Sequence, residues 1–389
     1  MNDYTKEENK ANRPSIEAQI YNWIRNVTFS EFYNEISKRI IGQDKMLCKI
    51  LAEVRSYIES LIMGEEKTCG NRHNIIIAAG SGTGKTETYR ALRDYFEIHI
   101  PGFLVTIFDV SSLTASGFKG CDPSDILLPY YRAGQTKAFG ICFLDEFDKK
   151  INPSHSGTGE NVNAEVQSQL LTIIEGGIIY NKQGAKISTE HMMFVGLGSF
   201  GVFRKNRSEV PRQIGIMKDD ERNKEDEKRD HFSPLEMEDI IEAGGSWELL
   251  GRFSYIVNYN KLSKEAIKQV IDKAAQDEAD AIGINLTLED RAIDELTEIS
   301  INSKFGCRFI HSKLHSLIMD AYMQALCELP KEHNILVNIH SLDNVSYAFT
   351  PYTDKEKHDD EIFQTILEME VNENEVPEDW IDEFIGKWE

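Results

Sequence analysis

A short run around residue 80 constrains the fold of this chain more than any other feature. Ile75, Ile76 and Ile77 are apolar, and they lead into the sequence Gly80-Ser81-Gly82-Thr83-Gly84-Lys85-Thr86. An apolar strand followed by a glycine-rich turn and Gly-Lys-Thr is the pattern of a phosphate-binding P-loop. The glycines let backbone amides turn towards an anion, and a helix expected over 84–96 points its positive N-terminus at the same place. The pattern predicts a nucleotide-binding strand–loop–helix unit, with Ala79 where the first glycine usually stands.

The residues at the end of this loop have distinct expected roles. We expect Lys85 to reach the β- and γ-phosphates of ATP, and the Thr86 hydroxyl to ligate Mg²⁺. Glu87 follows directly and is placed among the nucleotide-binding residues. The sequence therefore predicts ATP and Mg²⁺ as cofactors.

Apolar strands alternate with helices over the first two thirds of the chain. Nearly continuous apolar strands in such an alternation indicate an α/β fold, with a parallel sheet covered by helices on both faces. The expected strands are 74–78, 103–110, 139–145 and 192–197, and the expected helices are 84–96, 125–134 and 163–175.

The pattern also divides the chain into four parts. Residues 1–39 form a polar segment and a helix, and 40–255 form a large domain. Residues 256–350 form a small domain, helical nearly to residue 328, with one strand at 334–339. Residues 351–389 form an acidic tail whose apolar stripe fits a helix that packs on the chain itself or binds a partner. The stripe consists of Trp380, Ile381, Phe384, Ile385 and Trp388.

Composition excludes several classes of protein. The formal net charge of −22 argues against a general nucleic-acid-binding face. No run of about 18 apolar residues is present, so we expect no membrane span. Six cysteines are scattered without a Cys-x-x-Cys pair, which favours reduced thiols and a cytoplasmic protein over a zinc site or a disulfide framework.

A second motif strengthens the prediction of an ATPase. The apolar run Ile141-Cys142-Phe143-Leu144 ends in Asp145-Glu146. In P-loop ATPases a carboxylate at such a strand end holds Mg²⁺, and its neighbour polarises the attacking water. We assign these roles to Asp145 and Glu146.

Several segments resemble, in order along the chain, the motifs of AAA+ ATPases of the Clp/HslU branch, and most closely those of ClpX-like ATP-dependent protein unfoldases. The resemblance covers about residues 40–329, and it implies a large AAA+ ATPase domain followed by a small α-rich lid domain. The matching segments, besides the P-loop and the stretch 144–149 that contains Asp145 and Glu146, include Ile40-Ile41-Gly42-Gln43, Gly117-Phe118-Lys119-Gly120, Gly251-Arg252-Phe253 and Gly306-Cys307-Arg308, together with stretches within 108–114, 165–176 and 239–250.

The resemblance implies roles for several of these segments. Ile40 and Ile41 would pack beside the adenine. Gly117 to Gly120 would form a pore loop whose Phe118 grips an extended polypeptide. Arg252 would be an arginine finger that reaches the γ-phosphate of a neighbouring subunit, and Arg308 would contact the phosphates from the small domain of its own subunit.

One further match concerns a partner. Ile214-Gly215-Ile216 is an apolar tripeptide within the highly charged stretch 204–231. ClpX-like proteins carry a similar tripeptide there that docks on a ClpP-like peptidase. Two family features have no match here: residues 1–39 contain no cysteine for a zinc domain, and 177–188 lacks the family's basic triplet.

The resemblance thus implies a ring-forming, hexameric ATPase that unfolds protein substrates and delivers them to a ClpP-like peptidase, and we expect the protein to be cytoplasmic. Three alternatives stay open. The chain could remodel a dedicated protein complex without a peptidase, act as an AAA+ motor on nucleic acid, or bind ATP as a switch with little turnover. The acidic balance and the aromatic loop at 117–120 oppose the second, and the presence of Glu146 and Arg252 opposes the third.

Overall fold

The structure is a computed structural model, and it describes residues 14–62, 73–114, 121–152, 161–181, 184–204, 232–303 and 306–353. The chain divides into two compact units, Met1–Ala266 and Ile267–Glu389. Within the described residues, no helix is long and apolar enough to cross a lipid bilayer.

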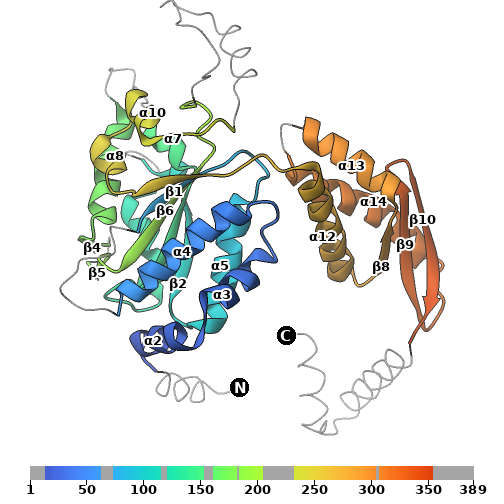
Figure 1. Ribbon diagram of the computed structural model, residues 1–389. Helices are drawn as coiled ribbons and strands as arrows, with labels where there is room; N and C mark the ends of the chain where they lie inside the picture. The colour runs from blue at the N-terminus through green and yellow to red at the C-terminus, as the bar shows by residue number, and fades with distance from the viewer. Residues whose placement is uncertain are drawn as a thin grey trace, which may run out of the picture. The chain divides into compact units, whose positions relative to one another are not determined.

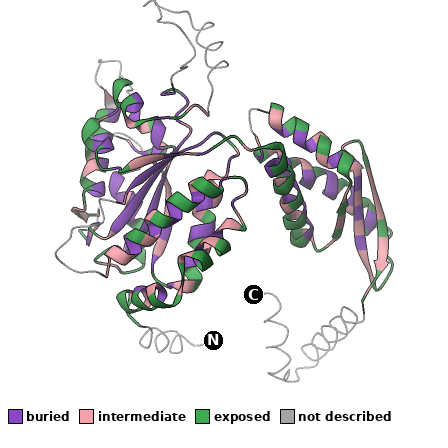
Figure 2. Cartoon of the chain, viewed as in Figure 1, coloured by how far each residue is buried: buried purple, intermediate pink, exposed green. Residues whose placement is uncertain are grey.

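A five-stranded parallel sheet forms the centre of the first unit (Figure 1). Three of its strands are almost completely buried, as the purple ribbons of Figure 2 show. This is the parallel α/β sheet that the continuous apolar runs predict, and the predicted fold class is confirmed. In spatial order the strands are β2 (Leu104–Asp109), β3 (Gly140–Asp145), β6 (Met192–Gly198), β1 (Ile75–Ala78) and β7 (Tyr255–Asn258).

Helices cover both faces of this sheet, so each strand contributes to two separate cores. Ile75 and Ile77 belong to one core, and their neighbours Ile76 and Ala78 belong to the other, as the two-residue period of a strand requires. The first core includes residues of α2 (Ile16–Asn26), α3 (Phe29–Ser37), α4 (Asp44–Ser60) and α5 (Lys85–His99). The second includes residues of η2 (Val110–Ser112), η3 (Pro123–Leu127), α6 (Leu128–Arg132), α7 (Phe147–Ile151), α8 (Val162–Ile174), α10 (Met237–Glu242) and α11 (Trp247–Leu250).

The first unit departs from the expected elements in several places. The strand β7 and the short helices α7, α10 and α11 match none of the expected elements. The helix expected over 125–134 is a 3₁₀ turn, η3, followed by the short helix α6. Pro129 lacks the N–H that would continue a single helix, so the chain restarts at this point. A hairpin of β4 (Ile178–Tyr180) and β5 (Lys186–Ser188) follows α8. Its three-residue strands are too short to give a periodic signal in the sequence.

In its described residues, the second unit combines three helices with a three-stranded sheet of order β10-β9-β8. In β9, every second residue from Ile335 to Ser341 is buried, whereas the residues between are partly exposed. Sequence periodicity predicts the helices and part of β9, but not β8 or β10. The elements are α12 (Lys264–Ile282), β8 (Asn285–Leu288), α13 (Asp290–Asn302), α14 (Arg308–Leu326), β9 (His333–Ser341) and β10 (Asn344–Pro351).

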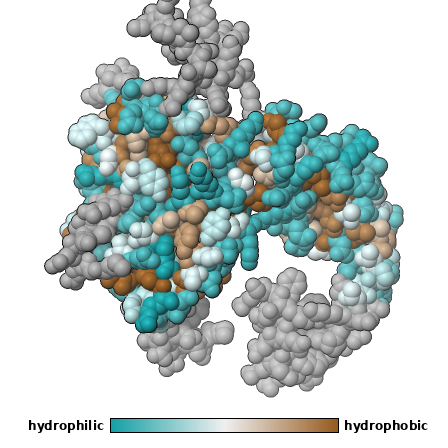
Figure 3. Space-filling model, viewed as in Figure 1, coloured by the Kyte–Doolittle hydropathy of each residue, from teal (hydrophilic) through white to brown (hydrophobic). Residues whose placement is uncertain are grey.

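The surface is largely polar. On the face shown in Figure 3, hydrophilic residues dominate and hydrophobic residues gather in small patches. The most exposed large apolar side chains of the described residues include Ile98 and Trp247. Single exposed apolar residues are normal on a folded protein, so these carry no functional conclusion by themselves.

Gly140 provides a test of the sheet's packing. A Cβ added here would lie 1.9 Å from the backbone oxygen of Leu104 in the neighbouring strand β2. Relieving this clash would require the backbone of the paired strand β2 to move. We therefore expect Gly140→Ala to lower the free energy of unfolding by more than about 3 kcal/mol. Gly134→Ala is the matched control. Both glycines have a positive φ, 155° at Gly140 and 73° at Gly134, but nothing lies within 4 Å of a Cβ added at Gly134. Urea unfolding should show a loss of only about 1 kcal/mol for this control.

Candidate nucleotide-binding site

The predicted P-loop lies between β1 and α5. Gly82 and Gly84 have positive φ angles of 72° and 100°, a conformation in which a side chain would be strained. Gly84 is also the N-cap residue of α5 and provides no side-chain hydrogen bond to the first turn. The N-terminal amides of this 15-residue helix thus lie beside the loop, where they suit a phosphate group.

Two hydrogen bonds hold the loop in shape. The Thr83 hydroxyl, which is buried, donates to the carbonyl oxygen of Gly80 over 2.9 Å. The Lys85 ammonium donates to the carbonyl oxygen of Ala79 over 2.6 Å. Lys85 and Thr86 are half-buried, and Ser81 is exposed at the tip. The ammonium therefore lies over the loop, where phosphate oxygens can compete with the Ala79 carbonyl for it.

The segment Ile40–Gln43 lies next to the P-loop and is firmly anchored. Cγ2 of Ile40 is 4.0 Å from the place a Cβ on Gly84 would occupy. Ile40 is buried, so the half-exposed Ile41 is the better placed of the two to meet a base. The buried Gln43 amide donates to the carbonyl oxygen of Asn260 over 2.8 Å and accepts from the Asn260 amide over 3.0 Å. This pair joins the segment to the chain that follows β7.

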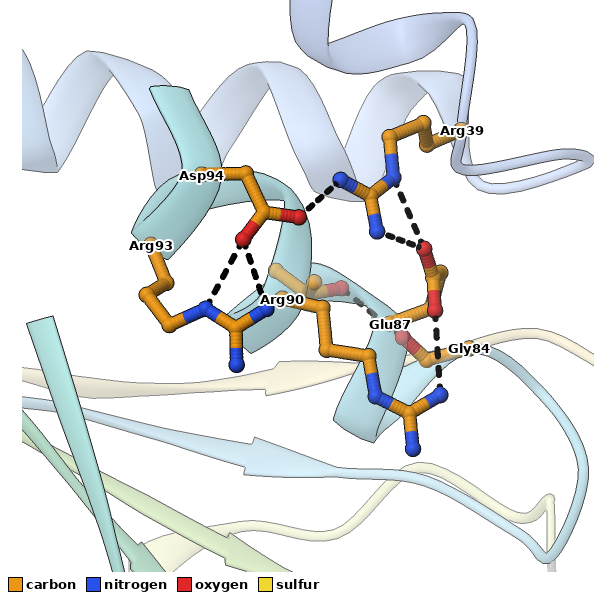
Figure 4. A network of polar contacts seen from close by, with 7 residues as sticks. Arg39, Gly84, Glu87, Arg90, Arg93 and Asp94 are labelled. Carbon is orange, nitrogen blue, oxygen red and sulfur yellow. Dashed lines mark hydrogen bonds and ion pairs between the residues drawn. The ribbon is translucent and has the colours of Figure 1, made fainter. Parts of the chain in front are cut away.

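The Glu87 carboxylate forms ion pairs with arginine side chains (Figure 4). The Arg39 guanidinium donates to one Glu87 oxygen from two nitrogens, over 2.6 and 2.8 Å, and to Asp94 over 2.6 Å. Burial works against ionisation of Asp94, but hydrogen bonds from Arg39 and Arg93 outweigh it and lower the pKa of that carboxyl. Glu87 therefore ties α5 to the residue that precedes Ile40. Arg39 could not be found from the sequence, because it lies 48 residues from its partner Glu87.

Asp145 and Glu146 lie at the carboxyl end of β3. β6 separates β3 from β1, so the two strands are about 10 Å apart, at about 4.8 Å per step. The acidic pair and the P-loop thus lie at the same, carboxyl end of the parallel sheet. Glu146 is exposed and has a φ of 53°, an uncommon conformation for a residue with a side chain. Such backbone strain tends to occur at functional sites.

Asp148 binds the residues that follow β6 at the same end of the sheet. The sequence alone indicates no role for it. It is buried, and one of its oxygens accepts from the Ser199 hydroxyl over 3.0 Å and from the Phe200 amide over 2.8 Å. Ser199 is the polar residue at the end of β6. Its hydroxyl is therefore directed at Asp148, and the contact fixes the end of β6 beside the acidic pair.

Arg252 follows α11, on a backbone fixed by Asn74, whose side-chain amide donates to the Arg252 carbonyl oxygen over 3.1 Å. Its guanidinium forms an ion pair with Glu175, and the two side chains are 43% and 39% exposed. In the second unit, Arg308 is the first residue of α14 and is exposed. Gly117, Phe118, Lys119 and Gly120 lie outside the described residues, as do Ile214, Gly215, Ile216 and the tail beyond 353.

Comparison with known proteins accounts for this arrangement. Residues 71–256 match the family described as AAA domain (Cdc48 subfamily), a range that contains the P-loop, the acidic pair and Arg252. The chain is also 24% identical, over 78% of each chain, to the ATP-dependent Clp protease ATP-binding subunit ClpX of Bacteroides thetaiotaomicron. Residues 71–256 are an AAA domain, and the chain is an ATPase that resembles ClpX. Nucleotide binding follows from this and fits the P-loop geometry.

Two further relatives extend the similarity of this ATPase. The ClpX of Bacteroides fragilis is 24% identical over 82% of each chain. The ClpX of Borrelia duttonii is 25% identical over 82% of this ATPase and 78% of the relative. Since each match covers about four fifths of the ATPase, the similarity extends beyond residues 71–256.

Proposed function

We propose that this ATPase is an ATP-dependent protein unfoldase that works as a ring of identical subunits, six by analogy with its relatives. The observation that supports this most directly is the position of the P-loop and the acidic pair at the carboxyl end of the sheet, in a chain similar to ClpX over four fifths of its length. Hydrolysis would power the passage of a polypeptide through the ring.

Each residue at the carboxyl end of the sheet has its own role in ATP hydrolysis. Lys85 binds the β- and γ-phosphates. Thr86 and Asp145 would hold Mg²⁺, and a metal bound there would neutralise charge on the transferred phosphoryl group. Glu146 orients and polarises the attacking water, and its exposed carboxylate can reach out from the end of β3. Ile41 packs beside the base, with Ile40 behind it.

Two arginines would link hydrolysis to the assembly and to domain movement. Arg252 stabilises the γ-phosphate charge in the site of a neighbouring subunit. Its ion pair with Glu175 is partly exposed, and such pairs are worth only about 0–1 kcal/mol, so releasing Arg252 costs little. Arg308 contacts the phosphates from the second unit of the same subunit, which makes the angle between the units depend on the nucleotide.

The substrate and partner come from the resemblance alone. Phe118, flanked by Gly117 and Gly120, would grip the polypeptide without reading its sequence, with Lys119 beside it. Ile214, Gly215 and Ile216 would insert into a ClpP-like peptidase ring in the cytoplasm. ATP-dependent unfolding of a stable, tagged fluorescent protein tests the unfoldase. Unfolding without any peptidase binding would instead favour a remodeller of a dedicated protein complex.

We expect Arg252→Ala to lower ATP turnover about 1,000-fold with the affinity for ATP unchanged, because an arginine finger acts on the transition state. Glu175→Gln is the matched control: it removes the partner of Arg252 within the subunit and should keep turnover. A mixture of Arg252→Ala and Glu146→Gln subunits should recover part of the activity, since each supplies what its neighbour lacks. Phosphate release measures the turnover of Arg252→Ala, Glu175→Gln, Glu146→Gln and the mixture, each beside the unaltered chain. Normal turnover of Arg252→Ala, or a mixture as inactive as its parts, would refute a finger acting between subunits.

A further inference from the structure

We infer that Phe232 is a positioning residue that holds the P-loop in its phosphate-binding shape by packing on Gly80. A Cβ added to Gly80 would lie 2.7 Å from Cζ and 3.0 Å from Cε1 of Phe232. Gly80 is buried, and it is not among the glycines with a positive φ. Its backbone conformation therefore does not demand glycine. The space beside its Cα is taken by the aromatic ring.

The position of the ring is set by anchors on both sides. Arg204, buried just after β6, donates from its guanidinium to the carbonyl oxygens of Ser233 and, over 3.3 Å, of Ser199. Asn258, the last residue of β7, accepts from the Leu235 amide over 2.9 Å and donates to the Leu235 carbonyl oxygen over 3.0 Å. The two anchors attach this short segment to the ends of two different strands.

The topology places β1 between those anchors. In the sheet, β6 and β7 are the two neighbours of β1. Residues 232–235 therefore run across the carboxyl ends of three adjacent strands, and Phe232 meets the chain where β1 becomes the P-loop. Because the ends of β6 and β7 both bind residues 232–235, we expect the Phe232 ring to keep one position beside the P-loop.

A rigid neighbour limits the conformational freedom of a glycine-rich loop. Gly80, Gly82 and Gly84 give the loop many conformations to lose when its amides converge on a phosphate. An apolar ring packed on one side reduces that freedom before the nucleotide arrives, and preorganisation raises affinity. The ring contributes no charge or hydrogen bond to the reaction. Phe232 should thus affect the affinity for ATP and ADP alike, but not turnover at saturating ATP.

The test compares Phe232→Ala, Phe232→Leu, Gly80→Ala and the double variant Gly80→Ala/Phe232→Ala in the full chain. Titration with fluorescent ATP and ADP gives the dissociation constants, and phosphate release gives kcat. Phe232→Ala should raise both dissociation constants about tenfold with kcat within about twofold, and Phe232→Leu should restore most of the affinity. Val202→Ala, at an exposed side chain near Arg204, is the control and should change neither.

The double variant decides whether the contact itself matters. Gly80→Ala should displace the ring and weaken binding about as much as Phe232→Ala, and the double variant should bind no more weakly than either single one. Dissociation constants that multiply in the double variant, or an unchanged affinity of Phe232→Ala, would overturn the inference. Urea unfolding of each variant checks the fold, and Phe232→Leu and Gly80→Ala keep the test decisive if Phe232→Ala is unstable. The inference rests on nucleotide binding at the P-loop alone, so a failure of the unfoldase proposal would leave it standing.

Discussion

Replacing Glu146 by glutamine is expected to leave ATP bound and to lower its hydrolysis by about 100- to 10,000-fold, the usual contribution of a general base. Glutamine keeps the size of the side chain but cannot polarise the attacking water as a carboxylate does. Glu146 is exposed and its backbone N–H donates to Asp145 over 3.0 Å, a contact that the substitution leaves in place. The free energy of unfolding should therefore change by less than about 0.5 kcal/mol.

Phosphate release at saturating ATP and titration with fluorescent ATP separate hydrolysis from binding in this variant. Glu190→Gln is the matched control, because Glu190 precedes β6 and so lies at the opposite end of the sheet. Its turnover should equal that of the unaltered chain. Turnover of Glu146→Gln within about threefold of the unaltered chain would mean that another group activates the water.

Replacing Lys85 by alanine is expected to weaken ATP binding at least about 100-fold. Hydrogen bonds from a charged donor are worth about 1.5–3 kcal/mol each, and two such bonds to phosphate oxygens correspond to a loss of this size. The ammonium already lies over the loop, 2.6 Å from the Ala79 carbonyl oxygen, so it needs little movement to reach a phosphate. Adenosine, which lacks phosphates, should bind the variant and the unaltered chain equally weakly.

Titration with fluorescent ATP measures this loss, with Lys137→Ala as the control. Lys137 is exposed and precedes β3, at the opposite end of the sheet from the P-loop. Tight ATP binding by Lys85→Ala would place the phosphates elsewhere and would refute the assignment of the loop.

Strong local patterns made the centre of the first unit predictable. The apolar runs that became β1, β3 and β6 are continuous, and burial on both faces requires that continuity. The glycine-rich turn and the acids after β3 likewise carry their chemistry in consecutive residues. Both motifs follow strands that the apolar runs predict, β1 and β3.

The contacts that support the site were not predictable, because they join residues far apart in the sequence. Arg39 meets Glu87 across 48 residues, and Asp148 meets Ser199 across 51. Gln43 meets Asn260 across 217. No spacing rule links such pairs, since only the packed sheet brings them together. β8 escaped prediction for a related reason: four residues give little periodicity, and their strand character comes from pairing with β9.

The most direct test of the central proposal is unfolding of a stable, tagged fluorescent protein by the purified chain, with Glu146→Gln beside it and with or without a ClpP-like peptidase. The proposal predicts that fluorescence falls only with ATP and the unaltered chain, and that the substrate is degraded only when peptidase is present. Vigorous ATP hydrolysis with no loss of fluorescence for any of several tags would contradict it.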